Sequence, residues 1–69
     1  VNVRNKMNLI NLMIEEEQIA AVQENSYAIR YIDNPSEAVQ LAAVQQNGTA
    51  IKFIKKPSDL VKIYATMKA

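Results

Sequence analysis

The chain has no cysteine, no histidine and no tryptophan, and it has one glycine and two prolines in 69 residues. Without cysteine, a disulfide, a thiolate metal site and a thiol nucleophile are all excluded. Without histidine, the commonest metal ligand and general base is missing too. No apolar run approaches the ~20 residues that a helix needs to cross a bilayer. We therefore expect a cytoplasmic protein that is not an enzyme, has no membrane partner and uses neither a cofactor nor a metal.

What the chain does contain is typical of one small compact domain. Apolar residues make up 49% of the sequence, charged residues make up 22%, and the net charge is +1. This balance separates the chain from disordered and fibrous proteins. A domain of this length buries only ~60% of the surface of its unfolded chain, so its stability is marginal without disulfides or metals. Regular helix packing or association with other chains is the remaining source of stability.

An internal repeat of 22 residues organises the sequence. Residues 19–40 read IAAVQENSYAIRYIDNPSEAVQ, and residues 41–62 read LAAVQQNGTAIKFIKKPSDLVK. Aligned without a gap, the two copies agree at half of their positions, and Ile10 falls in the register of Ile32. The chain therefore divides into a degenerate copy or cap at 1–18, repeats at 19–40 and 41–62, and a truncated copy at 63–69.

Each repeat is predicted to contain a long helix, at residues 35–46 in the first copy. Asn34 is the expected N-cap of this helix, and Glu37 follows it at the spacing of a capping box. In the next copy Lys56 stands in place of the asparagine and cannot cap, so we expect Ser58 to take this role.

A shorter helix is predicted to follow the long one. Asn47 and Gly48 are expected to end the long helix, because glycine tolerates the left-handed conformation that often closes a helix. The apolar segment at residues 49–54 is then long enough for about two turns.

The long helix is apolar on two sides. On a helical wheel, Leu41 and Val44 occupy one side, and Val39 and Ala43 occupy the other. A helix of this kind is normally sandwiched between neighbours. The sequence therefore predicts an all-α fold of short stacked helix-turn-helix repeats, a small α-solenoid. A three- or four-helix bundle is the alternative.

The pattern A-A-V-Q-x-N-x-x-A-I-x-[YF]-I-x-x-P-S extends over residues 19–62. It resembles a short tandem helical repeat, of the NPSEAVQLAAVQQNG type, in uncharacterised bacterial and tailed-phage proteins, and residues 34–48 carry the closest likeness. The resemblance implies a phage or bacterial origin and a scaffold or interaction role. It implies no catalytic or ligand-binding residues.

The last copy stops within its long helix, which leaves apolar positions without a following repeat. Val61 and Ala65 repeat the registers of Val39 and Ala43, so we expect a partner to cover them. The candidate protein-contact residues are apolar or aromatic side chains near the ends of the repeats: Tyr27, Val61, Tyr64 and Met67. The sequence thus predicts a non-enzymatic protein–protein interaction module that forms a homodimer, assembles as a scaffold, or binds or inhibits a protein such as a host factor.

Nucleic-acid binding is the alternative function. Residues 1–46 carry a net charge of −3, whereas residues 47–69 carry +4. The candidate phosphate contacts are the lysines of the basic part: Lys52, Lys55, Lys56 and Lys62. Against this, the net charge of the whole chain is close to zero.

Other conspicuous residues are expected to be structural. The carboxylates at residues 15–17 suit a solvated helix start, and Tyr31 and Phe53 share a register that we assign to the core. Gln18, Gln40 and Lys62 share another register and would form a polar ladder across one face of a stack.

Overall fold

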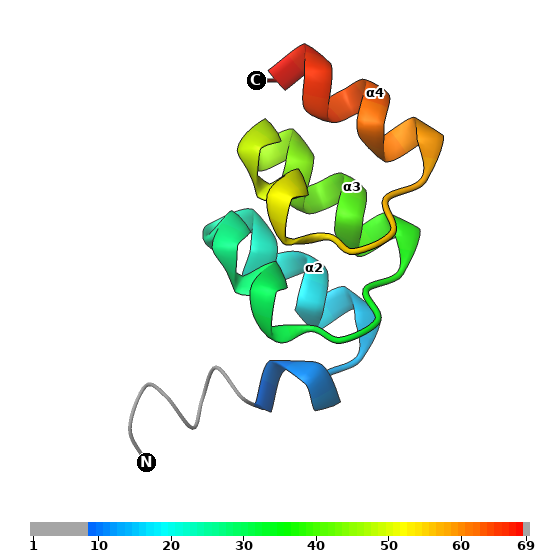
Figure 1. Cartoon of the computed structure of the whole chain (residues 1–69). Coiled ribbons are helices and arrows are strands. Elements are labelled where there is room, and N and C mark those ends of the chain that lie inside the picture. Colours follow the sequence, from blue (N-terminus) through cyan, green and yellow to red (C-terminus); the bar gives the residue numbers. More distant parts are fainter. Residues whose placement is uncertain (1–8, 69) are drawn as a thin grey trace.

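The computed structural model describes residues 9–68 of the chain, and the regular structure over that range is entirely helical (Figure 1). The prediction of an all-α fold is thereby confirmed. Within this range, α-helices alternate with shorter 3₁₀ helices, labelled η: η1 (Ile10–Leu12), α2 (Glu15–Glu24), η2 (Ser26–Tyr31), α3 (Glu37–Gln46), η3 (Gly48–Phe53) and α4 (Asp59–Lys68). None of these helices is long and apolar enough to cross a membrane.

The helices form a stack of two layers. The long helices α2, α3 and α4 follow one another in chain order, and α3 contacts both neighbours, while α2 and α4 do not touch (Figure 1). η2 packs on α2 and α3, and η3 packs on α3 and α4, so the short helices form the second layer. The stack measures 37 × 19 × 17 Å. This is the small α-solenoid that the repeat predicts, and it differs from a bundle, in which all the long helices share one core.

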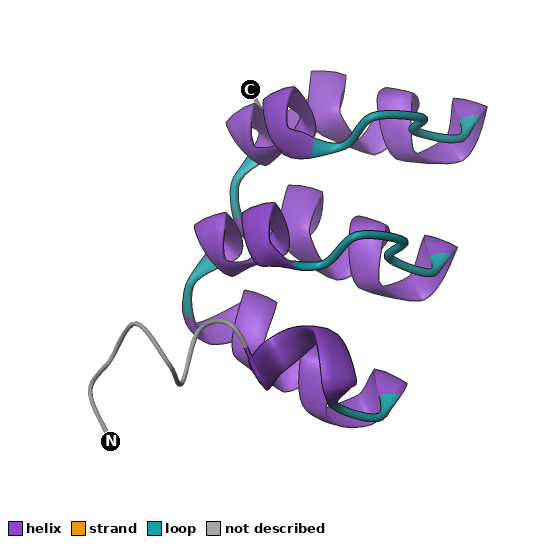
Figure 2. Ribbon diagram, turned by 60° about the horizontal axis from the view of Figure 1, so that its bottom comes forward, coloured by secondary structure: helices purple, strands orange, loops and turns teal. Residues whose placement is uncertain are grey.

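Successive copies of the repeat have the same backbone. Asn25 and Asn47, which are 22 residues apart, have φ and ψ of −147° and 104°, and of −156° and 112°. Ile32 and Ile54 have −105° and 116°, and −105° and 117°. The same loop shape recurs in consecutive repeats of the stack (Figure 2). Each repeat is therefore one structural unit, used more than once.

The spacing of two buried residues agrees with the 3₁₀ form of η2. Ser26 and Ile29, three positions apart, are both buried, and Ala28 beside them is buried as well. A 3₁₀ helix has three residues per turn, so side chains three positions apart line one edge. The predicted short helix at residues 49–54 is confirmed, but it spans Gly48–Phe53, one residue earlier at each end, and Ile54 is extended.

Serine caps the long helices. Ser36 Oγ accepts a hydrogen bond from the Val39 amide at 3.3 Å, and Ser58 Oγ accepts the matching bond in α4 at 3.3 Å. The expected N-cap at Asn34 is wrong, because the backbone at Ser36 is still extended, with ψ of 164°. Glu37 is consequently the first helical residue, too early for a capping box but well placed for the helix dipole. The expected cap at Ser58 is confirmed.

Gly48 does not close α3 in a left-handed conformation, so this expectation is wrong. No residue of the described range has a positive φ. Instead, the extended Asn47 ends α3, and its Oδ1 caps η3 by accepting a hydrogen bond from the Thr49 amide at 3.1 Å. Asn25 makes the same bond with the Tyr27 amide one repeat earlier. The recurring asparagine is therefore the residue that connects the long-helix layer to the short-helix layer.

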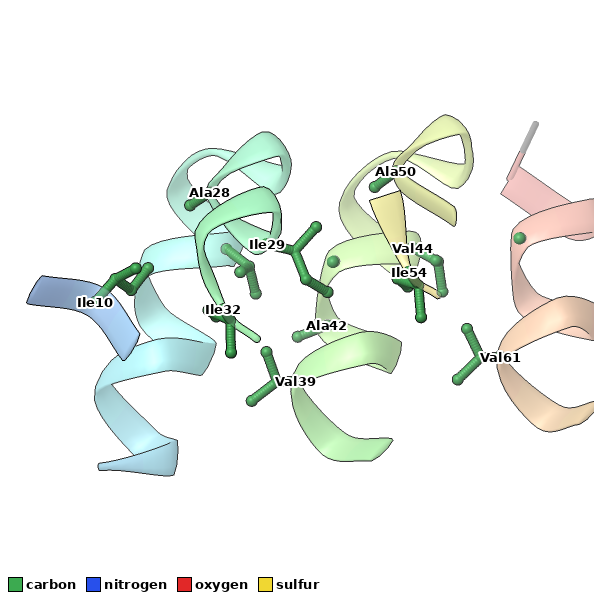
Figure 3. Close-up of a cluster of buried hydrophobic side chains, with 13 residues drawn as sticks. Ile10, Ala28, Ile29, Ile32, Val39, Ala42, Val44, Ala50, Ile54 and Val61 are labelled. Carbon is green, nitrogen blue, oxygen red and sulfur yellow. The ribbon is translucent and has the colours of Figure 1, made fainter. Parts of the chain in front are cut away.

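One continuous apolar core runs between the two layers (Figure 3). Four fully buried valines in two recurring registers form its centre: Val22 and Val44, and Val39 and Val61. Ile10 is buried like Ile32, with which it shares a register. The described part of the predicted copy at 1–18 thus contributes to the same core, and residues 1–8 lie outside the described range.

Candidate functional site

The outer surface of α4 carries large apolar side chains that remain exposed. Leu60 is 43% exposed, Ile63 is 57% exposed and Met67 is 71% exposed. Their i, i+3 and i+7 spacing places them on one face of the helix, and the half-buried Tyr64 lies within the same arc. We call Leu60, Ile63, Tyr64 and Met67 the α4 apolar face. It includes two of the predicted protein-contact residues, Tyr64 and Met67.

This face occurs in the last helix alone among the described long helices. At the registers of Leu60 and Met67, the earlier helices carry polar or small residues: Glu16 and Gln23 in α2, and Ala38 and Gln45 in α3. At the register of Ile63 they carry Ile19 and Leu41, which are half-buried and pack against the core. Among the described long helices, α4 thus carries the exposed apolar face, while the exposed apolar residues at the other end of the stack, Leu9, Leu12 and Ile14, precede α2. A contiguous apolar surface of this kind is typical of a contact site.

Val61 does not belong to the α4 apolar face. It is fully buried, and its side chain points toward α3 (Figure 3). The expectation that Val61 and Ala65 lack a cover is therefore wrong. Their register faces the preceding helix, so α3 covers them as α2 covers Val39 one repeat earlier. Tyr27 lies on η2, which does not contact α4, and thus belongs to a different surface.

Three aromatic rings and a guanidinium group meet on the short-helix layer. Tyr27 and Phe53 pack edge to face, with ring centroids 5.4 Å apart and ring planes at 80°. Arg30 Cζ lies 5.1 Å from the Phe53 centroid and 6.0 Å from the Tyr31 centroid. These separations suit cation–π attraction. We call Tyr27, Arg30, Tyr31 and Phe53 the η aromatic cluster.

The rings of this cluster are exposed to solvent. Tyr27 is 44% exposed, Tyr31 is 40% exposed and Phe53 is 36% exposed. Tyr27 is exposed, as a candidate protein-contact residue must be, but the assignment of Tyr31 and Phe53 to the core is wrong. In each copy the isoleucine that follows the ring fills the core instead. Sequence reasoning also missed Arg30, although it lies three residues after Tyr27 and so on the same edge of a 3₁₀ helix.

The two layers carry charge of opposite sign. The α-helices of the described range hold six of the seven acidic residues of the chain, whereas residues 26–36 and 48–58 together carry a net charge of +3. The one ion pair among the described side chains joins Lys62 and Asp59, both on α4, at 4.0 Å. Arg30 and Lys52, on the short helices, therefore have no carboxylate partner within that part of the chain.

The four lysines predicted to contact nucleic acid are all exposed, but they lie in two separate places. Lys52 and Lys62 line a shallow hollow of about 360 Å³ between η3 and α4. Lys55 and Lys56 line another hollow, of about 220 Å³, in which Asp33 also lies. The structure thus does not bring these lysines together in one patch.

Glutamines of the expected polar ladder fix the chain locally instead of lining an exposed face. Gln18 Nε2 donates to the carbonyl of Ile10 at 3.1 Å, and Gln40 Nε2 donates to the carbonyl of Pro35 at 2.9 Å. Both side chains are half-buried, and the Oε1 of Gln40 has no hydrogen-bond partner. Their register therefore serves the connections between helices.

The acidic residues of the described range do not gather into a metal-binding cluster. Glu15, Glu16 and Glu17 are exposed in the first turn of α2, as expected for a solvated helix start. No group of three or more side chains of the described residues could hold a metal ion. Comparison with known protein families, curated proteins and solved structures finds no match to the chain.

Proposed function

We propose that the chain is a non-enzymatic protein-interaction module that binds through the α4 apolar face. The observation that carries this proposal is the exposure of Leu60, Ile63 and Met67 at one end of the stack. Burying these side chains in a contact removes apolar surface from water, which is the main driving force of association. The flexible thioether of Met67 adapts readily to the shape of a partner surface.

A second copy of the chain fits this face. When two α4 helices pack antiparallel about a twofold axis between residues 63 and 64, Leu60 of one meets Met67 of the other. Ile63 meets Tyr64 in the same arrangement. The face is thus self-complementary, as the isologous interface of a symmetric dimer requires. The homodimer expected from the sequence is therefore the form of interaction that we propose.

The mass of the protein in solution tests this proposal. We expect sedimentation equilibrium to show a concentration-dependent dimer for the wild type and a monomer for the double variant Leu60→Glu/Met67→Glu. Ala38→Glu/Gln45→Glu is the matched control, because it adds the same charges at the same registers of α3. This control should remain a dimer, and circular dichroism should show that both variants keep their helices. Equal masses for both double variants would overturn the assignment.

A heterologous protein, such as a host factor, is distinguished by the same variants. A wild-type chain that is monomeric at all concentrations would overturn the homodimer. Capture from a host lysate would then be compared between the wild type and the two double variants. Loss of a captured protein with Leu60→Glu/Met67→Glu alone would retain the interaction role for this face, and equal capture by all three would overturn it.

Nucleic-acid binding through the four lysines has less support from the geometry. Lys52 and Lys62 lie apart from Lys55 and Lys56, and Lys62 lies beside Asp59. Phosphate contacts strengthen binding when several cations follow one strand, and this set does not form such a track.

A further inference from the structure

The η aromatic cluster holds Arg30 in an unusual way for an exposed arginine. Its guanidinium lies against the rings of Phe53 and Tyr31, and no carboxylate of the described residues pairs with it. A guanidinium that stacks on rings keeps its N–H donors, which point outward from its edge, free for another acceptor. The cluster therefore presents a fixed cation with unused donors beside exposed aromatic surface.

The charge around the cluster favours an anionic ligand. The short-helix layer and its connections, residues 26–36 and 48–58, carry four cations against Asp33 alone. The carboxylate of Asp33 accepts a hydrogen bond from Asn11 at 2.8 Å, and the remaining acidic residues of the chain lie on α2, α3 and α4. An anionic polymer is thus attracted to one layer of the stack and repelled by the other.

The rings decide between kinds of anionic polymer. The cations alone would suit an acidic peptide or the outside of a duplex, but neither of these requires grouped, exposed aromatic side chains. Unpaired bases do, because each has a π-face that stacks on an aromatic ring, whereas the bases of a duplex are already stacked inside it. Exposed rings interleaved with cations are the arrangement that proteins use for single strands.

We propose that the η aromatic cluster binds single-stranded nucleic acid. Tyr27, Tyr31 and Phe53 offer bases the ring surface that Arg30 leaves exposed, while Arg30 contacts a phosphate. This site differs from the α4 apolar face, so it stands or falls independently of the protein-interaction role.

Fluorescence anisotropy with labelled oligo-dT and oligo-U tests binding to the wild-type chain. We expect binding at low salt that weakens as salt is added, and weaker binding of a duplex of equal length. Absence of binding at low salt would overturn the proposal. So would equal binding of the duplex, or displacement of oligo-dT by poly-glutamate as efficiently as by unlabelled oligo-dT, because the surface would then recognise charge alone.

Two matched variants test the role of the rings. Phe53→Leu removes a ring of the η aromatic cluster, and Gln23→Leu places the same side chain at an exposed position of α2, outside both proposed binding surfaces. Loss of a stacked base should weaken binding of oligo-dT at least about fivefold with Phe53→Leu, while Gln23→Leu should bind like the wild type. Equal effects of the two variants would contradict stacking at the cluster.

Substitutions of Arg30 separate charge from geometry and do not disturb the core, since this side chain is exposed. Arg30→Gln should lower the slope of log affinity against log salt by about 0.7, the value for one phosphate contact to a single strand. Arg30→Lys should keep that slope but bind more weakly, because an ammonium group does not stack as a guanidinium does. Wild-type binding by both Arg30→Gln and Phe53→Leu would overturn the proposal.

Discussion

Asn11 and Asp33, which are one repeat apart, join two successive repeats of the stack through a pair of hydrogen bonds. Asn11 Nδ2 donates to Asp33 Oδ2 at 2.8 Å, and the Asp33 amide donates to Asn11 Oδ1 at 2.9 Å. The pair ties the short turn that contains Ile10 to the loop that follows η2. Lys55 occupies the same register one repeat later and makes no such pair with Asp33. The contact between the first two repeats therefore has a pair of hydrogen bonds that the next contact lacks.

Removing this hydrogen-bonded pair should destabilise the fold measurably. We expect Asn11→Ala to lower the free energy of unfolding by about 1 kcal/mol, because each net hydrogen bond contributes ~0.5–1.5 kcal/mol and this pair is exposed. Lys55→Ala is the matched control and should change stability by less than about 0.5 kcal/mol. Urea denaturation measures both. Equal losses would show that the Asn11–Asp33 pair contributes no more than any surface side chain.

The serine caps give a second prediction. Ser36→Ala should lower the free energy of unfolding by about 1 kcal/mol, because it leaves the Val39 amide without its acceptor. Asn34→Ala should have almost no effect, since Asn34 lies outside α3 and does not cap it. Thermal and urea denaturation of the two variants would decide between these residues. A larger loss with Asn34→Ala would return the N-cap to the position that the sequence first suggested.

The repeat allowed much of the fold to be predicted, because its registers determine burial. The all-helical fold, the stack of repeats and the shared register of Ile10 and Ile32 all follow from positions that recur every 22 residues. The repeat does not specify whether an apolar side of a helix packs on the preceding helix or on the following one. Val61 looked uncovered because its register was apolar, yet that register packs backward on α3. Apolar spacing gives the sides of a helix that are buried, and only packing gives their neighbours.

The candidate sites were harder to predict than the fold for a similar reason. Tyr31 and Phe53 were assigned to the core as aromatic residues next to buried isoleucines. In a 3₁₀ helix the buried edge repeats every three residues, and in η2 Ser26 and Ile29 occupy it, while the extended Ile32 after the helix is buried as well. The rings are displaced outward, where they gather around Arg30. Had the short helices been α-helical, the buried arc would have been different, so the helix type itself decides the surface.

Gly48 provides a third prediction, and its direction is opposite to that for a left-handed glycine. Its φ is not positive, and Ser26 occupies the same buried register with a Cβ atom. Gly48→Ala should therefore be tolerated, and it should raise the free energy of unfolding by about 0.4–1 kcal/mol by reducing the freedom of the unfolded chain. Ser26→Gly, the reciprocal change, should lower it. A clear loss of stability with Gly48→Ala would mean that the layer at η3 has no room for one methyl group.

The last prediction concerns the difference between an inner short helix, η2, and an outer one, η3. Ile29 and Ile51 share a register, but Ile29 is fully buried, because η3 packs on η2, whereas Ile51 is half-buried, because no described short helix follows η3. We expect Ile29→Ala to lower the free energy of unfolding by about 3 kcal/mol, in the range for a buried isoleucine. Ile51→Ala should cost roughly half as much, since part of its side chain is already in water.

Urea denaturation of the two variants, with the wild type as reference, compares these losses directly. The slopes should stay equal, so that the midpoints report stability alone. In a repeat protein each repeat is stabilised by its nearest neighbours. An identical substitution must therefore lower the free energy of unfolding more where neighbours lie on both sides. Equal losses would mean that Ile51 is covered as completely as Ile29, and the stack would then need a further element over η3.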